Sequence, residues 1–119
     1  MRRSIRSRTR YVPGLVLAEV DYFLRNERRA MEALMRDLSR GAFTYAAPTL
    51  TILDRAMDID RQYADFGLGL VDASVVALAE KLGVYRLATR DVRHFSAVTC
   101  AGGRGFELVV KPRRPDRGG

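Results

Sequence analysis

Two aspartates and one glutamate stand where carboxylates could share a cation. Asp72 lies at the start of the small, apolar segment GLVDASVVALAEK, Asp91 follows VYRLATR, and Glu19 has only apolar and aromatic neighbours one helical turn away. Converging carboxylates repel one another unless a cation lies between them. Mg²⁺ or Mn²⁺ would suit, because these hard ions prefer carboxylate, water and phosphate oxygens. Such an ion can activate water and stabilise charge that develops on a phosphodiester.

The elements around Asp72 and Asp91 would bring these two residues together. We predict a helix from Asp72 to Leu82 that stops at Gly83, and then a strand over residues 84–89. A helix of about ten residues is roughly 15 Å long and a strand of five roughly 16 Å, so the strand returns to the level of the helix start. Asp72 and Asp91 then meet at the carboxyl edge of a sheet, where open α/β folds hold ligands.

Each acidic residue also has a simpler structural interpretation. Asp72 could cap its helix, Asp91 could belong to a turn, and Glu19 could form a buried ion pair. Because burying a lone carboxylate costs several kcal/mol, we expect Glu19 to have a partner. Asp21 has Arg25 at i+4, so an ion pair explains it better than a place in the site. The structural interpretations explain the residues one by one but not their convergence, and we favour a metal site.

Residues beside Asp91 could support that carboxylate. The hydroxyl of Thr89 could orient Asp91, and Arg90 could balance the acidic charge or contact a phosphate. His94 could act as a general base, but we interpret it as an ordinary loop residue, since carboxylates and a metal suffice.

Further helices and strands alternate along the chain and predict an α/β fold with a parallel sheet. Pro13 and Gly41 mark the start of one helix and the end of the next. Apolar spacing in a third helix predicts an inner face of Leu50, Leu53, Met57 and Tyr63. The expected helices are 13–26, 28–40 and one from a Thr49 or Thr51 cap to about 64, and the other expected strands are 42–46 and 106–110.

The basic charge of the chain is concentrated at its ends. Of the net charge of +7, residues 1–10 contribute +5 and residues 111–119 contribute +3, which leaves −1 for residues 11–110. We therefore predict a basic leader (1–10), one domain (11–110) and a basic, disordered tail (111–119). These ends could contact nucleic acid phosphates, although terminal arginine runs are more often solvated tails.

Cysteine content and hydropathy favour a cytoplasmic protein. The one cysteine, Cys100, allows neither an internal disulfide nor a thiol metal cluster. The apolar run from Tyr11 to Ala18 is interrupted by Pro13 and is too short to span a membrane. We expect no membrane association.

Three motifs together resemble the PIN-domain ribonucleases that serve as VapC-type toxins of toxin–antitoxin pairs. They are VLAEVDYFL, LGLVDASVVALAEKLG and LATRDVRHFSAV, and the resemblance covers about residues 11–110. It implies a three-layer α/β/α parallel sheet, an Mg²⁺-dependent endoribonuclease, a homodimer and inhibition by a small cognate antitoxin. Glu19, Asp72 and Asp91 match the second, third and fourth acidic positions of the family.

The first acidic position of that family has no counterpart in this sequence. Family members carry it at the end of a first strand, whereas MRRSIRSRTR contains no acid. We therefore expect an N-terminally incomplete fold of this type. The alternative function is a shortened, catalytically impaired module that binds an antitoxin or itself and contacts nucleic acid through its basic ends.

Overall fold

Helices dominate the part of the chain that the structure describes. The structure is a computed structural model, and it describes residues 9–88, 105 and 107–109. The elements in chain order are β1 (Tyr11–Pro13), α1 (Gly14–Phe23), α2 (Arg28–Ser39), β2 (Thr44–Ala46), α3 (Leu50–Gln62), the 3₁₀ helix η2 (Ala64–Phe66), α4 (Gly69–Leu82), β3 (Arg86–Ala88) and β4 (Glu107–Val109).

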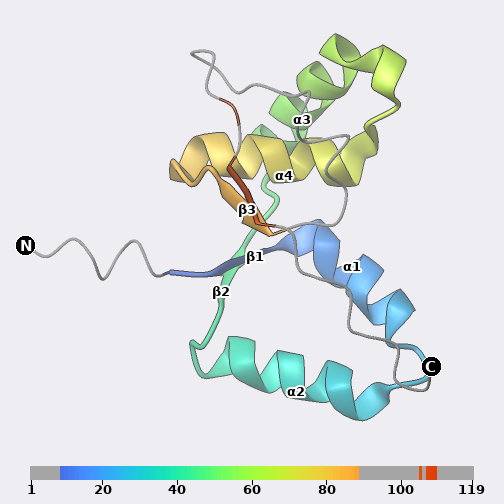
Figure 1. Cartoon of the computed structure of the whole chain (residues 1–119), viewed down its shortest axis with the longest axis vertical. Coiled ribbons are helices and arrows are strands. Elements are labelled where there is room, and N and C mark those ends of the chain that lie inside the picture. The colour runs from blue at the N-terminus through green and yellow to red at the C-terminus, as the bar shows by residue number, and fades with distance from the viewer. Residues whose placement is uncertain (1–8, 89–104, 106, 110–119) are drawn as a thin grey trace, which may run out of the picture.

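The strands pair in parallel, as the alternation of helices and strands predicts. Strand β1 pairs with β2, with Val12 opposite Tyr45, and β3 pairs with β4, with Leu87 opposite Leu108. These are two separate two-stranded sheets among the described residues. Figure 1 shows them between α3 and α4 on one side and α2 on the other. The α/β class is thereby confirmed, and each of the three strands predicted from sequence has a described strand within its predicted range.

Local signals set the start of α3 and the end of α4. Thr49 caps α3, because its Oγ1 accepts a hydrogen bond from the Ile52 backbone N–H at 3.3 Å. Gly83 ends α4 in the left-handed conformation at φ 69°, which glycine adopts without a Cβ clash. Strand β1 was not predicted, and it leads directly into α1 at Pro13.

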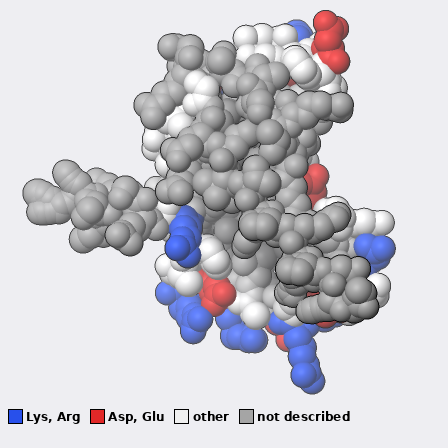
Figure 2. Space-filling view, viewed as in Figure 1, with Lys and Arg blue, Asp and Glu red and all other residues white. Residues whose placement is uncertain are grey.

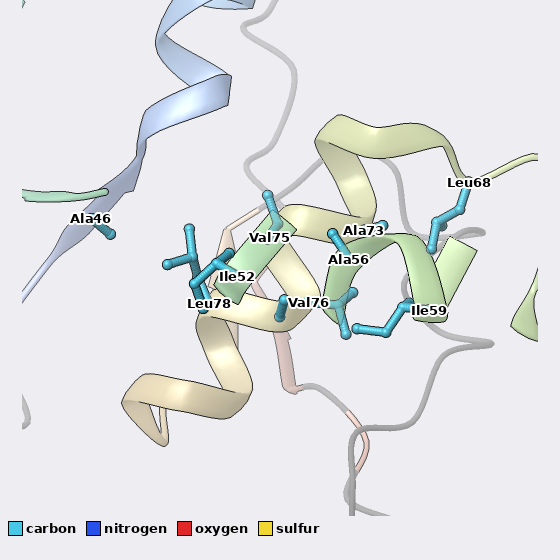
Figure 3. Close-up of a cluster of buried hydrophobic side chains, with 10 residues drawn as sticks. Ala46, Ile52, Ala56, Ile59, Leu68, Ala73, Val75, Val76 and Leu78 are labelled. Carbon is cyan, nitrogen blue, oxygen red and sulfur yellow. The ribbon is translucent and has the colours of Figure 1, made fainter. Parts of the chain in front are cut away.

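The core lies where α3 packs against α4. Seven consecutive residues of α4, from Ala73 to Ala79, are buried. Figure 3 shows the side chains of Ala73, Val75, Val76 and Leu78 in one cluster with those of α3. A helix that is apolar on all sides belongs in the interior. The polar exception, Ser74, donates from Oγ to the Val71 carbonyl oxygen at 2.6 Å.

The predicted inner face of α3 is wrong at Leu50 and Met57, whereas Leu53 is partly buried and Tyr63 packs against the core. The buried residues of α3 are Ile52, Ala56 and Ile59, whereas Leu50 is 78% exposed and Met57 is 46% exposed. The predicted set and the buried set both recur at three- and four-residue intervals, so periodicity alone cannot tell which set faces the core. Ala56 is fully buried, and its small side chain permits close contact with α4.

Within the described ranges, no helix has both the length and the hydropathy that are needed to cross a bilayer.

Candidate functional site

Glu19 lies in the middle of α1, on the face that points to solvent. It is exposed, together with Ala18, Tyr22 and Phe23. The expected burial of Glu19 is therefore wrong. Its apolar neighbours Tyr22 and Phe23 do not bury it, because their own side chains are 60% and 75% exposed. The Glu19 carboxylate is consequently accessible to water and to a ligand.

The start of α1 is fixed by a close approach of three chain segments. A Cβ on Gly14 would lie 2.5 Å from Cδ of Pro48 and 2.7 Å from the Tyr45 hydroxyl. Only glycine leaves room for this contact, since real Cβ atoms do not approach other atoms so closely. The position of α1, and with it that of Glu19, therefore depends on β2 and the segment that follows it.

Asp21 forms an ion pair, but with a different arginine from the one predicted. Arg28 of α2 donates from Nη2 to Asp21 Oδ1 at 2.6 Å, and from Nη1 to the Leu24 carbonyl oxygen at 3.2 Å. Arg25 instead donates to the Tyr22 carbonyl oxygen at 2.8 Å and lies over the Tyr22 ring. Arg28 can reach Asp21 because the short link between α1 and α2 turns the two helices toward each other (Figure 1).

Helix α4 begins at Gly69, three residues earlier than predicted, and Asp60 caps its first backbone N–H group. Oδ1 of Asp60 accepts a hydrogen bond from the Gly69 N–H at 2.9 Å. The N-cap position itself is held by Leu68, whose side chain makes no capping bond. Asp72 is therefore not the N-cap residue of α4. It is a partly buried residue of the first turn, where the helix dipole favours a negative charge.

Helices α1 and α4 contact each other, and both contact β1. The helices that carry Glu19 and Asp72 are thus neighbours. The convergence of these two residues with Asp91 stays a prediction, because Asp91 lies outside the described residues, as do Thr89, Arg90 and His94. Within the described ranges alone, no group of three or more His, Cys, Asp or Glu side chains could hold a metal ion.

An ion pair between α3 and α4 was not predicted from the sequence. Arg55 donates from Nε and Nη2 to the two carboxylate oxygens of Glu80, at 2.8 and 2.9 Å. The Glu80 side chain is only 13% exposed. Both residues lie on otherwise regular helices, and their 25-residue separation gives no local signal. This bidentate contact holds together the two helices of the core.

The chain is similar in sequence to a known protein family and to a named relative. Residues 1–99 match the sequence model of the PIN domain. The chain is 34% identical, over 100 residues, to ribonuclease VapC26 from Mycobacterium tuberculosis. The aligned segment covers 82% of this chain and 74% of that protein. Glu19, Asp72 and Asp91 all fall within the range that the family model matches.

Proposed function

The chain belongs to the PIN-domain family and is of the VapC type, and on this premise we propose that it is a metal-dependent endoribonuclease. Its substrate is RNA, and the bond that it cleaves is a phosphodiester. We further propose that it acts as the toxin of a type II toxin–antitoxin pair. The name of the relative supports the ribonuclease activity, since that protein is called a ribonuclease.

The place of Asp72 supports this proposal best. The N-cap position of α4 is held by Leu68 and the Gly69 N–H bonds to Asp60, so Asp72 is not the N-cap residue of this helix. Asp72 stands in the first turn of α4, beside the helix that carries Glu19. Carboxylates on two helices that contact each other are compatible with a cation site that both residues share.

Three carboxylates, those of Glu19, Asp72 and Asp91, would hold Mg²⁺ or Mn²⁺. This donor set fits these ions, which prefer oxygen ligands, and Mg²⁺ often takes only one or two carboxylates from the protein. When bound, the ion would activate water and stabilise the charge that develops on the phosphodiester.

Individual side chains of the chain would have different roles in the cleavage reaction. Glu19 orients the attacking water and accepts its proton, which its solvent-exposed position permits. The water oxygen forms a bond to phosphorus as the bond from phosphorus to the departing ribose oxygen breaks, and that oxygen takes up a proton from solvent. Thr89 orients Asp91, and Arg90 contacts the phosphate. Asp21 has a structural role in this scheme, because Arg28 pairs with it.

The partners of the chain follow from the family resemblance. We propose a cognate antitoxin protein as inhibitor, a second copy of the chain in a homodimer, and cytoplasmic localisation. The domain would span residues 11–110, with basic ends at 1–10 and 111–119 that add non-specific attraction for RNA.

Substitution of Asp72 by Asn tests the activity. Purified parent chain should cleave RNA in the presence of Mg²⁺ and not in the presence of EDTA, and Asp72→Asn should abolish this cleavage. Glu19→Gln should lower the rate by about 100-fold or more, since it removes the base. Asp54→Asn is the matched control, because Asp54 is an exposed carboxylate of α3. Undiminished cleavage by Asp72→Asn would refute the role of the residue.

A further inference from the structure

Ser74 is the one buried residue with a polar side chain among the residues that the structure describes. None of the described charged residues is buried, and Figure 2 shows Lys and Arg side chains along the edge of the molecule where α2 lies. Ser74 instead belongs to the run of seven buried α4 residues, and the other six members of that run are apolar. Alanine would suit this place, because it has the highest helix propensity and needs no hydrogen-bond partner. The hydroxyl at this position therefore needs an explanation other than packing.

The Ser74 hydroxyl bonds to the peptide unit that contains the backbone nitrogen of Asp72. Its Oγ donates to the Val71 carbonyl oxygen at 2.6 Å. That oxygen belongs to the peptide bond between Val71 and Asp72, and the atoms of a peptide unit lie in one plane from one Cα to the next. A hydrogen bond to this carbonyl thus orients the whole plane, up to the Cα of Asp72. The direction of the Asp72 side chain depends on that plane, and therefore on Ser74.

Stability alone does not account for this bond. It joins two residues of one helix that are three positions apart, so it connects no separate elements of the fold. In a regular α-helix the Val71 carbonyl oxygen also accepts the N–H of residue 75, so it would keep a partner without Ser74. Hydrogen bonds from Ser or Thr back to the preceding turn slightly destabilise a helix and often bend it. A departure from the most stable residue at a buried helix position is expected beside a functional site.

We propose that Ser74 is a positioning residue for Asp72: its hydroxyl holds the Val71–Asp72 peptide unit and thereby directs the Asp72 carboxylate toward the metal ion. Ser74 contacts neither the ion nor RNA in this role. Because Ser74 is fully buried, water does not compete for the bond, and Asp72 is oriented before the ion arrives. The inference rests on the proposed metal-dependent function, and it adds a residue that is not a carboxylate to those on which the metal site depends.

Metal binding, measured apart from RNA cleavage, tests this role. The full chain is titrated with Mn²⁺, which suits the same oxygen ligands as Mg²⁺, and the EPR signal of the free ion gives the Kd. Ser74→Ala should raise this Kd about tenfold, the effect of losing a group that orients a metal ligand. Its Tm in EDTA should equal that of the parent chain or exceed it by up to about 4 °C, because alanine favours the helix. A purely structural role of Ser74 does not predict weaker metal binding in a chain that is equally or more stable.

Two further variants separate the orientation of Asp72 from the stability of α4. Ser74→Thr keeps the hydroxyl but adds a methyl group at a fully buried position, so it should lower the Tm and keep the parent Kd. Val76→Ala creates a cavity two residues further along the same helix, and it should also lower the Tm without changing the Kd. A parent-like Kd in Ser74→Ala would overturn the proposal. An equal rise of Kd in Ser74→Ala and Val76→Ala would overturn it as well, since a general loosening of α4 would then explain both.

The same titration of Asp72→Asn distinguishes this inference from the proposed function. If the parent chain binds Mn²⁺ more tightly than Asp72→Asn does, the metal site stands, and the Kd of Ser74→Ala alone decides the role of Ser74. If the parent chain and Asp72→Asn bind Mn²⁺ equally, Asp72 is not a ligand, and both the proposed metal site and the role of Ser74 fail. A chain that binds Mn²⁺ through Asp72 but does not cleave RNA would remove the proposed activity and leave the test of Ser74 intact.

Discussion

Asp60 and Asp72 both stand near the N-terminus of α4, and they have different roles. Asp60 accepts the hydrogen bond from the Gly69 N–H, whereas Asp72 lies inside the first turn. Capping residues are usually sought immediately before a helix. Asp60 lies nine residues before Gly69, near the end of α3. The sequence therefore suggested Asp72 as the residue that caps α4, whereas in the fold Asp60 caps it.

Removal of the Asp60 carboxylate should destabilise the chain without touching the proposed site. Asp60→Ala leaves the Gly69 N–H without its acceptor, and the free energy of unfolding should fall by about 1 kcal/mol. For a domain of this size that lowers Tm by about 4 °C. Asp54→Ala, which removes an exposed carboxylate of the same helix, is the control. Equal melting temperatures for the two variants would contradict the capping role.

Element by element, the sequence predicted what local signals determine. Thr49 and Gly83 mark the ends of α3 and α4 correctly, because a side-chain cap and a left-handed glycine act within one turn. The buried face of α3 was wrong at Leu50 and Met57, because the residues that are buried on α3, Ile52 among them, are those that pack against α4. The burial expected for Glu19 was wrong for a similar reason: nothing local shows that its aromatic neighbours stay exposed.

The contact between α3 and α4 should depend on the Arg55–Glu80 pair. In a double-mutant cycle of Arg55→Met and Glu80→Gln, we expect a coupling free energy of about 1–2 kcal/mol, because the bond is bidentate and Glu80 is largely buried. The exposed pair Asp58–Arg61 on α3 is the matched control, with coupling below about 0.5 kcal/mol. Denaturant unfolding gives the coupling free energy of both pairs. Equal coupling free energies would contradict the claim that the Arg55–Glu80 pair stabilises the contact between α3 and α4 more than an exposed ion pair would.

At the scale of the whole molecule, the acidic residues of the proposed site could be identified from sequence, but their geometry could not. Glu19, Asp72 and Asp91 were identified from motifs, and the family match over residues 1–99 includes all three. The structure brings α1 beside α4, which no periodicity in either helix specifies. The convergence of Glu19, Asp72 and Asp91 stays a prediction, because Asp91 lies outside the described residues.

The basic ends should contribute salt-sensitive RNA affinity that is separate from cleavage. Residues 1–10 carry +5 and residues 111–119 carry +3. Neutralising their arginines to Gln should flatten the plot of log K against log salt by about 0.7 for each phosphate that the ends no longer neutralise. Cleavage at saturating RNA should persist in this variant. Abolition of all RNA binding would favour the alternative of a module that holds nucleic acid through its ends only.

A thermal melt with and without about 10 mM Mg²⁺ tests the central claim most directly, for the parent chain, Asp72→Asn and Asp54→Asn. If Mg²⁺ binds with a Kd of about 1 mM, linkage adds about 1.4 kcal/mol, or about 4–8 °C in Tm. We expect this shift in the parent and in Asp54→Asn, and none in Asp72→Asn. If Mg²⁺ does not change the Tm of the parent chain, or if it raises the Tm of all three chains equally, a carboxylate metal site at Asp72 would be contradicted.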